Sequence, residues 1–121
     1  MAKRKSKRKQ MTDRLDKLWS HAVKQRVGFK CEYCGKESYL NSHHVFSRSN
    51  FSTRWDLSNG FCLCAGCHTL KNFSAHKAPL EFAEWMIEQR GQEWYDDLKR
   101  RAHMVIKFSI MDLEEIAGRL Q

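Results

Sequence analysis

The fold of this chain is decided by residues 31–68, which read CEYCGKESYLNSHHVFSRSNFSTRWDLSNGFCLCAGCH. Two C-x-x-C pairs open and close this stretch: Cys31, Cys34, Cys64 and Cys67. Each pair offers zinc two thiolates from one side, and two pairs complete the tetrahedral set that the ion prefers. A double histidine, His43-His44, lies between the pairs, and His68 directly follows the last cysteine. The pattern therefore predicts a structural zinc ion that builds a scaffold beside a separate group of imidazoles.

The cysteine count argues against a disulfide framework. The chain has five cysteines, an odd number, and its basic N-terminus has no apolar stretch behind it that would mark a secretory signal. On a strand, the fifth cysteine, Cys62, would share a face with Cys64 and could compete with it as a ligand. The C-x-x-C spacing favours Cys64, so we expect Cys62 to be a small buried residue. These features indicate a reducing compartment, and we expect a cytoplasmic protein.

The net charge of +8 is concentrated at the N-terminus. Six of the 22 basic residues lie there: Lys3, Arg4, Lys5, Lys7, Arg8 and Lys9. Residues 10–121 hold the other 16 basic residues and all 14 acidic ones, so their net charge is only +2. We expect residues 1–10 to be a disordered basic tail, because they contain no apolar anchor.

A basic tail of this kind suits DNA, because each Lys or Arg that approaches the phosphates releases condensed counterions. The alternative is a tail that only keeps the protein in solution. A membrane surface is a less suitable partner, because the next segment lacks a Lys/Arg-rich amphipathic face. No apolar run approaches the roughly 20 residues that span a bilayer.

Residues 11–121 are expected to form one domain, because the chain of 121 residues is too short for two. We predict a helix over 11–27, where apolar residues recur at three- and four-residue steps. Thr12 can cap its first turn, and Gly28 lies just beyond its end. Residues 29–40 are predicted to form a short hairpin around the first cysteine pair.

The middle of the chain is predicted to run strand, loop, strand, helical turn. We expect the two strands at 41–47 and 61–64, separated by a polar irregular loop at 48–60. A helical turn or short helix should follow from Cys67 to about Phe73.

The last third, residues 79–120, is predicted to be helical. Pro79 suits the first turn of a helix, and Gly91 interrupts the helical pattern. Ser109-x-x-Asp112 has the form of a capping box in front of the final helix. These helices would be additions to the cysteine-framed core.

The double histidine, Asn59 and His68 together resemble the HNH, or ββα-metal, nuclease motif in its cysteine-framed form. Asn59 follows His44 by 15 residues and precedes His68 by nine, and both intervals are usual for that motif. The alternative for Asn59 is a turn residue, since Asn-Gly is a hairpin signal. The resemblance covers residues 29–73 and continues more weakly to about residue 103.

Two further segments extend the resemblance, namely Arg54 to His68 and the helices around Arg90-Gly91. They are similar to small phage and prophage HNH proteins and, more loosely, to recombination endonucleases of the NinG type. The resemblance implies an α+β fold with a zinc-stabilised ββα-metal core at 29–73 and flanking N- and C-terminal helices. It also implies a bacterial host cell, with phage packaging or recombination proteins as candidate partners.

The resemblance implies a role for each motif residue in phosphodiester hydrolysis. His44 would be the general base, since a neutral imidazole with a pKa of about 6.5 can accept a proton from water. His43 and His68 would hold one divalent cation, Mg²⁺ or Mn²⁺, that stabilises the scissile phosphate. Asn59 would hold the loop geometry and keep His44 oriented. Many relatives have a further histidine four residues after His68, where this chain has Asn72, whose amide oxygen could ligate a hard cation from the same helix face.

Several residues around the motif have two interpretations. Arg48 and Arg54 are candidate phosphate contacts, and the alternative is a solvated loop charge. Three aromatic residues could stack on bases, although core packing is their more ordinary role: Phe46, Phe51 and Trp55. Three histidines lie outside the motif, and we expect them to be structural or solvent-exposed: His21, His76 and His103.

These patterns lead to one functional hypothesis and two rivals. The first is a metal-dependent DNA endonuclease, acting as a monomer or weak dimer, with low sequence specificity because phosphate contacts dominate. The second is a non-catalytic zinc ribbon that binds nucleic acid or a protein, and the third is a degenerate nuclease fold that serves as a packaging or recombination accessory. The zinc ribbon does not explain three histidines and an asparagine at nuclease spacing, and the intact set of these four residues argues against a degenerate nuclease.

Overall fold

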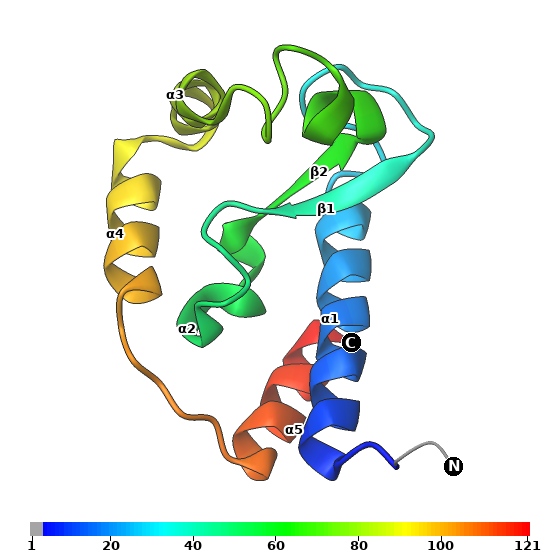
Figure 1. The fold of residues 1–121 in the computed structure, drawn as a ribbon, viewed down its shortest axis with the longest axis vertical. Helices are drawn as coiled ribbons and strands as arrows, with labels where there is room; N and C mark the ends of the chain where they lie inside the picture. The colour runs from blue at the N-terminus through cyan, green and yellow to red at the C-terminus, as the bar shows by residue number, and fades with distance from the viewer. Residues whose placement is uncertain (1–3) are drawn as a thin grey trace.

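The computed structural model describes residues 4–121, so Lys3, which we expected to contact DNA, lies outside the described residues. In these described residues, five α-helices and two strands follow one another with two short helical turns between them (Figure 1). The elements are α1 (Lys7–Arg26), β1 (Leu40–His44), α2 (Phe51–Arg54), η1 (Leu57–Asn59), β2 (Gly60–Cys64), η2 (Gly66–Leu70), α3 (Pro79–Arg90), α4 (Gln92–Ala102) and α5 (Ile110–Leu120). The architecture is the expected α+β one, a small sheet with helices on either side of it. None of the described helices is long and apolar enough to cross a bilayer.

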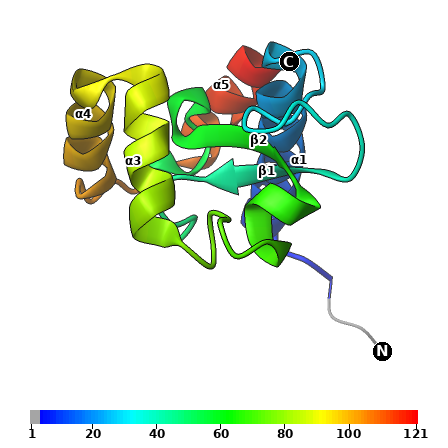
Figure 2. The same cartoon turned by 90° about the horizontal axis from the view of Figure 1, so that it is seen from above.

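The two strands pair antiparallel, with His43 opposite Phe61 and His44 opposite Gly60. Every residue of β2 is buried, because helices cover both of its faces. Cys62 joins the apolar cluster of α1 and α5, whereas Phe61 and Leu63 join the cluster of α3. Figure 2 shows the sheet between α1 on one side and α3 on the other. The continuous apolar run of β2 thus serves two cores at once.

The first helix begins earlier than the sequence predicted. Its N-cap is Ser6, whose hydroxyl accepts a hydrogen bond from the Lys9 backbone N–H at 3.1 Å. The expected cap, Thr12, lies inside the helix and donates to the carbonyl of Arg8. The prediction of a disordered tail over 1–10 is therefore wrong for residues 7–10, which form the first turn of α1. The physical reason is the buried side chain of Met11, which anchors this turn on α5.

The segment 29–40 is not a hairpin, because its described backbone forms turns and no strand precedes Leu40. The turn around the first cysteine pair is joined directly to β2. The Glu32 backbone N–H donates to the carbonyl of Cys62 at 2.8 Å, and a Glu32 carboxylate oxygen accepts from the Cys62 N–H at 2.7 Å. This pairing brings the first cysteine pair next to the second.

The C-terminal helices agree with the sequence predictions. Pro79 stands in the first turn of α3, and Gly91 takes a positive φ of 95° where the chain turns into α4. The capping box is present at α5, with the Ser109 side chain accepting from the Asp112 N–H and the Asp112 side chain accepting from the Ser109 N–H. Helix α5 lies beside α1 (Figure 1), so the end of the chain completes the core that its beginning starts.

Candidate metal centre and hydrolytic cleft

The four cysteines of the two C-x-x-C pairs converge on one point. The sulfur atoms of Cys31, Cys34, Cys64 and Cys67 all lie within 4.8 Å of one another. Cys34 is the exposed member and the other three are buried. Four thiol sulfurs at this separation, with no other donor type among them, fit a structural zinc ion.

Each pair of cysteines forms the same local turn. The Cys34 backbone N–H points at the sulfur of Cys31, and the Cys67 N–H points at the sulfur of Cys64, both at 3.5 Å. Burial raises the pKa of the Cys64 thiol, but hydrogen bonds from the Cys67 N–H and the neighbouring thiols outweigh it and lower this pKa to about 7. Burial and hydrogen bonds within the cluster raise the pKa of the Cys67 thiol, so Cys64 is the member of this pair that is shifted toward the thiolate form that a metal needs.

Cys62 takes no part in this cluster. It is fully buried in the apolar cluster of α1 and α5, and burial raises its pKa to about 11. It is the small buried residue that we expected.

A second convergence involves three imidazoles, and one of them is unexpected. Nitrogen atoms of His43, His68 and His76 lie within 4.8 Å of one another. His43 comes from β1 and is the least exposed of the three, His68 comes from η2, and His76 comes from the segment before α3. The sequence placed the first two together, whereas we expected His76 to be structural or solvent-exposed. Its distance from the motif gave no signal that would have identified it.

Asn72 does not occupy the position that the sequence argument required. Helix η2 ends at Leu70, and Lys71 is already extended, so Asn72 and His68 do not share a helix face. Asn72 is exposed and does not line the cleft described next, whereas His76 does. The assumption that the helix continues through residue 72 is therefore wrong.

The imidazoles lie in a cleft of about 560 Å³ between β1, the loop after it, and α3. His43, His44 and His68 all line it, together with Arg48 and His76. The same cleft thus brings together the expected base, the expected ligands and a loop arginine. Its size can admit a phosphodiester group with the water that attacks it.

His44 lies on the other face of β1 from His43 and is held by two contacts. Its ring stacks on the indole of Trp19 in α1, with centroids 3.9 Å apart and planes 12° from parallel. Its Nε2 lies 3.0 Å from the carbonyl oxygen of Arg54. Because a carbonyl can only accept, Nε2 carries the proton and donates, which leaves the lone pair on Nδ1. Among residues 4–121, Nδ1 has no hydrogen-bond partner.

Burial shifts His43 and His44 toward their neutral forms. Burial, followed by the proximity of His68, His76 and His44, lowers the pKa of His43 to about 3. Burial also lowers the pKa of His44, against the opposing effect of its bond to the Arg54 carbonyl. A neutral imidazole is the form that can bind a metal ion or accept a proton.

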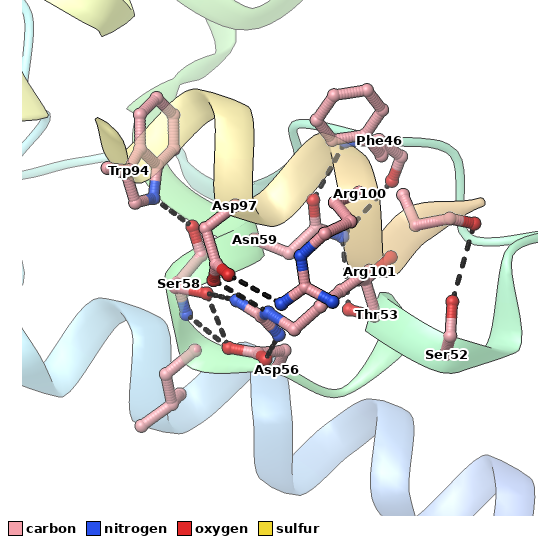
Figure 3. Close-up of polar contacts among 12 residues, drawn as sticks. Phe46, Ser52, Thr53, Asp56, Ser58, Asn59, Trp94, Asp97, Arg100 and Arg101 are labelled. Carbon is pink, nitrogen blue, oxygen red and sulfur yellow. Dashed lines mark hydrogen bonds and ion pairs between the residues drawn. The ribbon is translucent and has the colours of Figure 1, made fainter. Parts of the chain in front are cut away.

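Asn59 is fully buried and braces the loop that follows β1 (Figure 3). Its side-chain oxygen accepts from the Phe46 N–H at 2.8 Å, and its side-chain nitrogen donates to the carbonyls of Phe46 and Thr53, each at 3.1 Å. These bonds hold the chain between His44 and Arg54. The side-chain hydrogen bonds of Asn59 reach the backbone of Phe46 and Thr53, and none of them goes to the His44 ring.

Helix α4 fastens the other end of the same loop (Figure 3). The Arg101 guanidinium pairs with the carboxylates of Asp56 and Asp97 and donates to the Ser58 hydroxyl. Trp94 donates from its indole nitrogen to the Ser58 carbonyl at 2.9 Å. The turn η1, which carries Asn59 into β2, is thus held from α4 as well as from α1.

The two loop arginines occupy different environments. Arg54 is buried, with Nε and Nη2 donating to both oxygens of Asp16 in α1 at 3.0 and 2.8 Å. Its guanidinium is committed to this pair and is not presented to a phosphate at the surface. Arg48 is exposed at the rim of the cleft, 3.5 Å from Asp16. Of the two loop arginines, Arg48 is the one whose guanidinium is exposed at the cleft, and its contact with a phosphate stays a prediction.

The aromatic residues of the loop divide in the same way. Trp55 is buried in the α1–α5 core and donates to Asp16, so it does not face a nucleic acid. Phe46 lines the cleft against Tyr95, and Phe51 is exposed. Phe46 and Phe51 keep the prediction of base stacking open.

The basic N-terminal residues are exposed on and just before the first turn of α1. Lys5 and Lys9 pair with Asp13 at 2.8 and 2.7 Å, and Lys7 lies 3.8 Å from Glu114. Arg8 donates to the carbonyl of Phe108. Such exposed pairs exchange readily with solvent and contribute little to stability. Arg4 is exposed too. The role of these basic residues in binding DNA stays a prediction.

Two residues outside the motif support the cleft and were not identified by sequence reasoning. The indole of Trp19 stacks on the ring of His44. Asp16 pairs with the guanidinium of Arg54, whose backbone carbonyl accepts a hydrogen bond from the His44 ring. In the sequence both belong to the ordinary periodicity of a helix, so nothing distinguished them from core and surface positions.

Residues 31–74 match a family model, that of the HNH endonuclease domain. No curated protein sequence and no solved structure matches the chain. The match contains both cysteine pairs and the double histidine, and it ends two residues before His76. Helix α1, with Trp19, and helices α3 to α5 lie outside it.

Proposed function

We propose that this chain, which carries an HNH endonuclease domain at residues 31–74, is a metal-dependent endonuclease that hydrolyses phosphodiester bonds in DNA. The observation that supports this most is the arrangement of the cleft. His44, whose ring is held in one orientation, lines the cleft. The converging imidazoles of His43, His68 and His76 line the same cleft. Hydrolysis needs both a proton acceptor for water and a cation at the phosphate.

His44 would act as the general base. Its Nε2–H is held by the Arg54 carbonyl, so Nδ1 can take the proton of the attacking water. Trp19 fixes the plane of the ring, and burial keeps the pKa of His44 below its ordinary value, so the base stays unprotonated at neutral pH. Asn59 would act as a positioning residue through the loop that it braces.

His43 and His68 would hold the divalent cation, which supplies positive charge to the scissile phosphate and to the departing 3′ oxygen. The expected products are 5′-phosphate and 3′-hydroxyl ends. Arg48, at the rim of the cleft, would contact a phosphate of the substrate. The cysteine cluster would hold a structural zinc ion that keeps η2, and so His68, in place.

DNA binding by this chain would be dominated by phosphate contacts. The net charge of +8 favours a polyanion, and the basic residues at the start of α1 would raise the encounter rate. Low sequence specificity follows, because contacts to the backbone carry no base information. The phage origin and the packaging or recombination partners that the resemblance implied stay predictions.

Plasmid nicking tests this function. The full chain, loaded with zinc, is incubated with supercoiled plasmid and a series of divalent ions. The expected result is metal-dependent nicking that falls by about 10²–10⁴-fold in His44→Ala. His103→Ala is the matched control, since this histidine is exposed at the end of α4 and bonds only to the Lys99 carbonyl. Thermal melting and zinc content show that each variant is folded.

The outcomes separate the function classes. Equal cleavage by His44→Ala and the wild-type chain would refute the assignment of the base. DNA binding without cleavage under any divalent ion would instead support a non-catalytic zinc module or an accessory protein.

A further inference from the structure

We propose that His76 is the third protein ligand of the cation in the cleft, and that the resulting set of three imidazoles selects a borderline transition ion such as Zn²⁺, Ni²⁺ or Co²⁺ over Mg²⁺. The proposal deepens the function given above, on which it rests only in taking this cleft as the hydrolytic site. His76 lies outside the family match, which ends at residue 74.

The three rings have the geometry of ligands that share one ion. The Nε2 atoms of His68 and His76 are 3.0 Å apart, and their ring planes are 80° from parallel. The ring of His43 is 69° and 79° from those of His68 and His76, with centroids 5.2 and 5.4 Å away. Two imidazole nitrogens that each lie about 2.0–2.1 Å from a zinc ion in tetrahedral geometry are themselves about 3.3 Å apart. The observed separation of His68 and His76 thus suits a shared ion.

The backbone holds His76 at this place. The His76 N–H donates to the carbonyl of His68 at 3.1 Å, and the Ala75 N–H donates to the carbonyl of Cys67 at 2.9 Å. These two bonds fasten the segment before α3 onto η2, next to the second cysteine pair. Ser74, which is fully buried, closes the turn by accepting from the Lys77 N–H at its hydroxyl and from the Ala78 N–H at its carbonyl. His76 is therefore part of a built turn and not of a free loop.

The same turn explains why Asn72 does not serve as the ligand. The chain leaves η2 at Lys71 and returns only at Ala75, so residue 72 lies on the outward part of this excursion. A histidine eight residues after His68 takes the place that a histidine four residues after it would have on a continuous helix. The departure from the family pattern at position 72 is thus compensated by tertiary structure.

The donor set determines the class of metal. Three imidazole nitrogens converge here, and no carboxylate of the described residues belongs to the group. Imidazole suits zinc, nickel and other borderline ions, whereas Mg²⁺ requires oxygen ligands in near-octahedral geometry. His76 is exposed and the cleft is open, so positions remain for water and a phosphate oxygen, as in catalytic zinc sites with three protein ligands.

Cobalt titration tests the proposal without measuring nuclease activity. The full chain with zinc in its cysteine cluster is titrated with Co²⁺. Weak visible d–d bands without the intense near-ultraviolet thiolate charge transfer would report an imidazole site. We expect one such site in the wild-type chain, weakened in His76→Ala by more than the roughly 10–100-fold that loss of an outer-shell partner costs. Competing Mg²⁺ in large excess should not displace the cobalt.

Two control variants sharpen the result. His103→Ala removes an imidazole outside the cleft, and Asn72→Ala removes the ligand that the sequence suggested; both should bind Co²⁺ like the wild-type chain. Equal affinity in His76→Ala and the wild-type chain, or weakening by Asn72→Ala instead, would overturn the proposal. Because binding is measured directly, normal Co²⁺ binding in a chain that cleaves no DNA would refute the proposed function and leave this inference standing.

Discussion

The cysteine cluster and the histidine cluster are neighbours in space, yet they are assembled in different ways. All four cysteines come from two tight turns whose internal geometry is local, with each N–H-to-sulfur contact spanning three residues. The three histidines come from β1, η2 and the segment before α3, and only tertiary contacts bring them together. The comparison teaches that a metal site made from short loops can be recognised from spacing, whereas one made from separate elements requires the fold.

The largest effect is expected from Cys31→Ser, because this substitution breaks the cysteine cluster, on which the histidine cluster depends. Loss of one thiolate should release zinc, and the small core between η2 and α3 should unfold with it. Zinc content by mass spectrometry and thermal melting by circular dichroism measure both effects. Cys62→Ala is the matched control, since it removes a buried thiol outside the cluster and should keep the zinc. Full zinc content and native melting in Cys31→Ser would contradict the scaffold assignment.

The next largest effect is expected from Asn59→Ala, which should damage the histidine side and spare the zinc. The substitution leaves the Phe46 N–H and the carbonyls of Phe46 and Thr53 without their buried partner. Each unsatisfied buried group costs about 1–3 kcal/mol, so we expect unfolding to become easier by several kcal/mol. Urea denaturation measures the loss, and plasmid nicking should fall with it. A stable variant with full activity would show that the loop does not need this brace.

A smaller effect is expected from Gly60→Ala, which tests the support that α1 gives to His44. A Cβ at this position would lie 2.5 Å from a methyl carbon of Val23 and 2.9 Å from the indole of Trp19. Helix α1 must shift to admit it, at a cost of about 1–3 kcal/mol. Because Trp19 carries the His44 ring, nicking should fall more than zinc binding does. Gly118→Ala is the control, since its added Cβ meets nothing within 4 Å.

The smallest effect is expected from acid titration of the Asp16 network. Burial opposes ionisation of Asp16, but hydrogen bonds from Arg54 and Trp55 outweigh it and lower its pKa below the ordinary value. A carboxyl whose pKa is lower in the folded state contributes stability that is present above its unfolded pKa of about 4 and is lost as pH falls through the folded value.

Urea midpoints between pH 7 and pH 3 measure this contribution, with Asp16→Asn as the comparison. We expect the advantage of the wild-type chain to shrink only below about pH 4. An advantage that is constant over the whole range would contradict the role assigned to Asp16.

The sequence predicted features that depend on neighbouring residues better than features that depend on packing between distant ones. The two cysteine turns, the Pro79 helix start and the Ser109 capping box each depend on residues within one turn of each other, and all were predicted. The start of α1 was misplaced, because the apolar anchor Met11 has its effect through packing on α5, far away in the sequence.

The candidate site shows the same division. The resemblance to the HNH motif picked out His43, His44, Asn59 and His68, and the structure places all of them in or directly behind one cleft. The sequence could not identify Trp19, which contacts His44 from α1. It also could not show that Arg54 is buried against Asp16. Those contacts join helix and loop residues more than 20 positions apart.

The amino-acid sequence by itself determined that four thiols would converge on one point and that imidazoles would lie beside them, because a C-x-x-C turn sets its own geometry over three residues. Only the tertiary structure decided which histidine joins His43 and His68. The backbone bonds from Ala75 and His76 to Cys67 and His68 close a loop of eight residues. This loop depends on buried contacts such as those of Ser74, and the spacing of residues in the sequence does not predict such contacts.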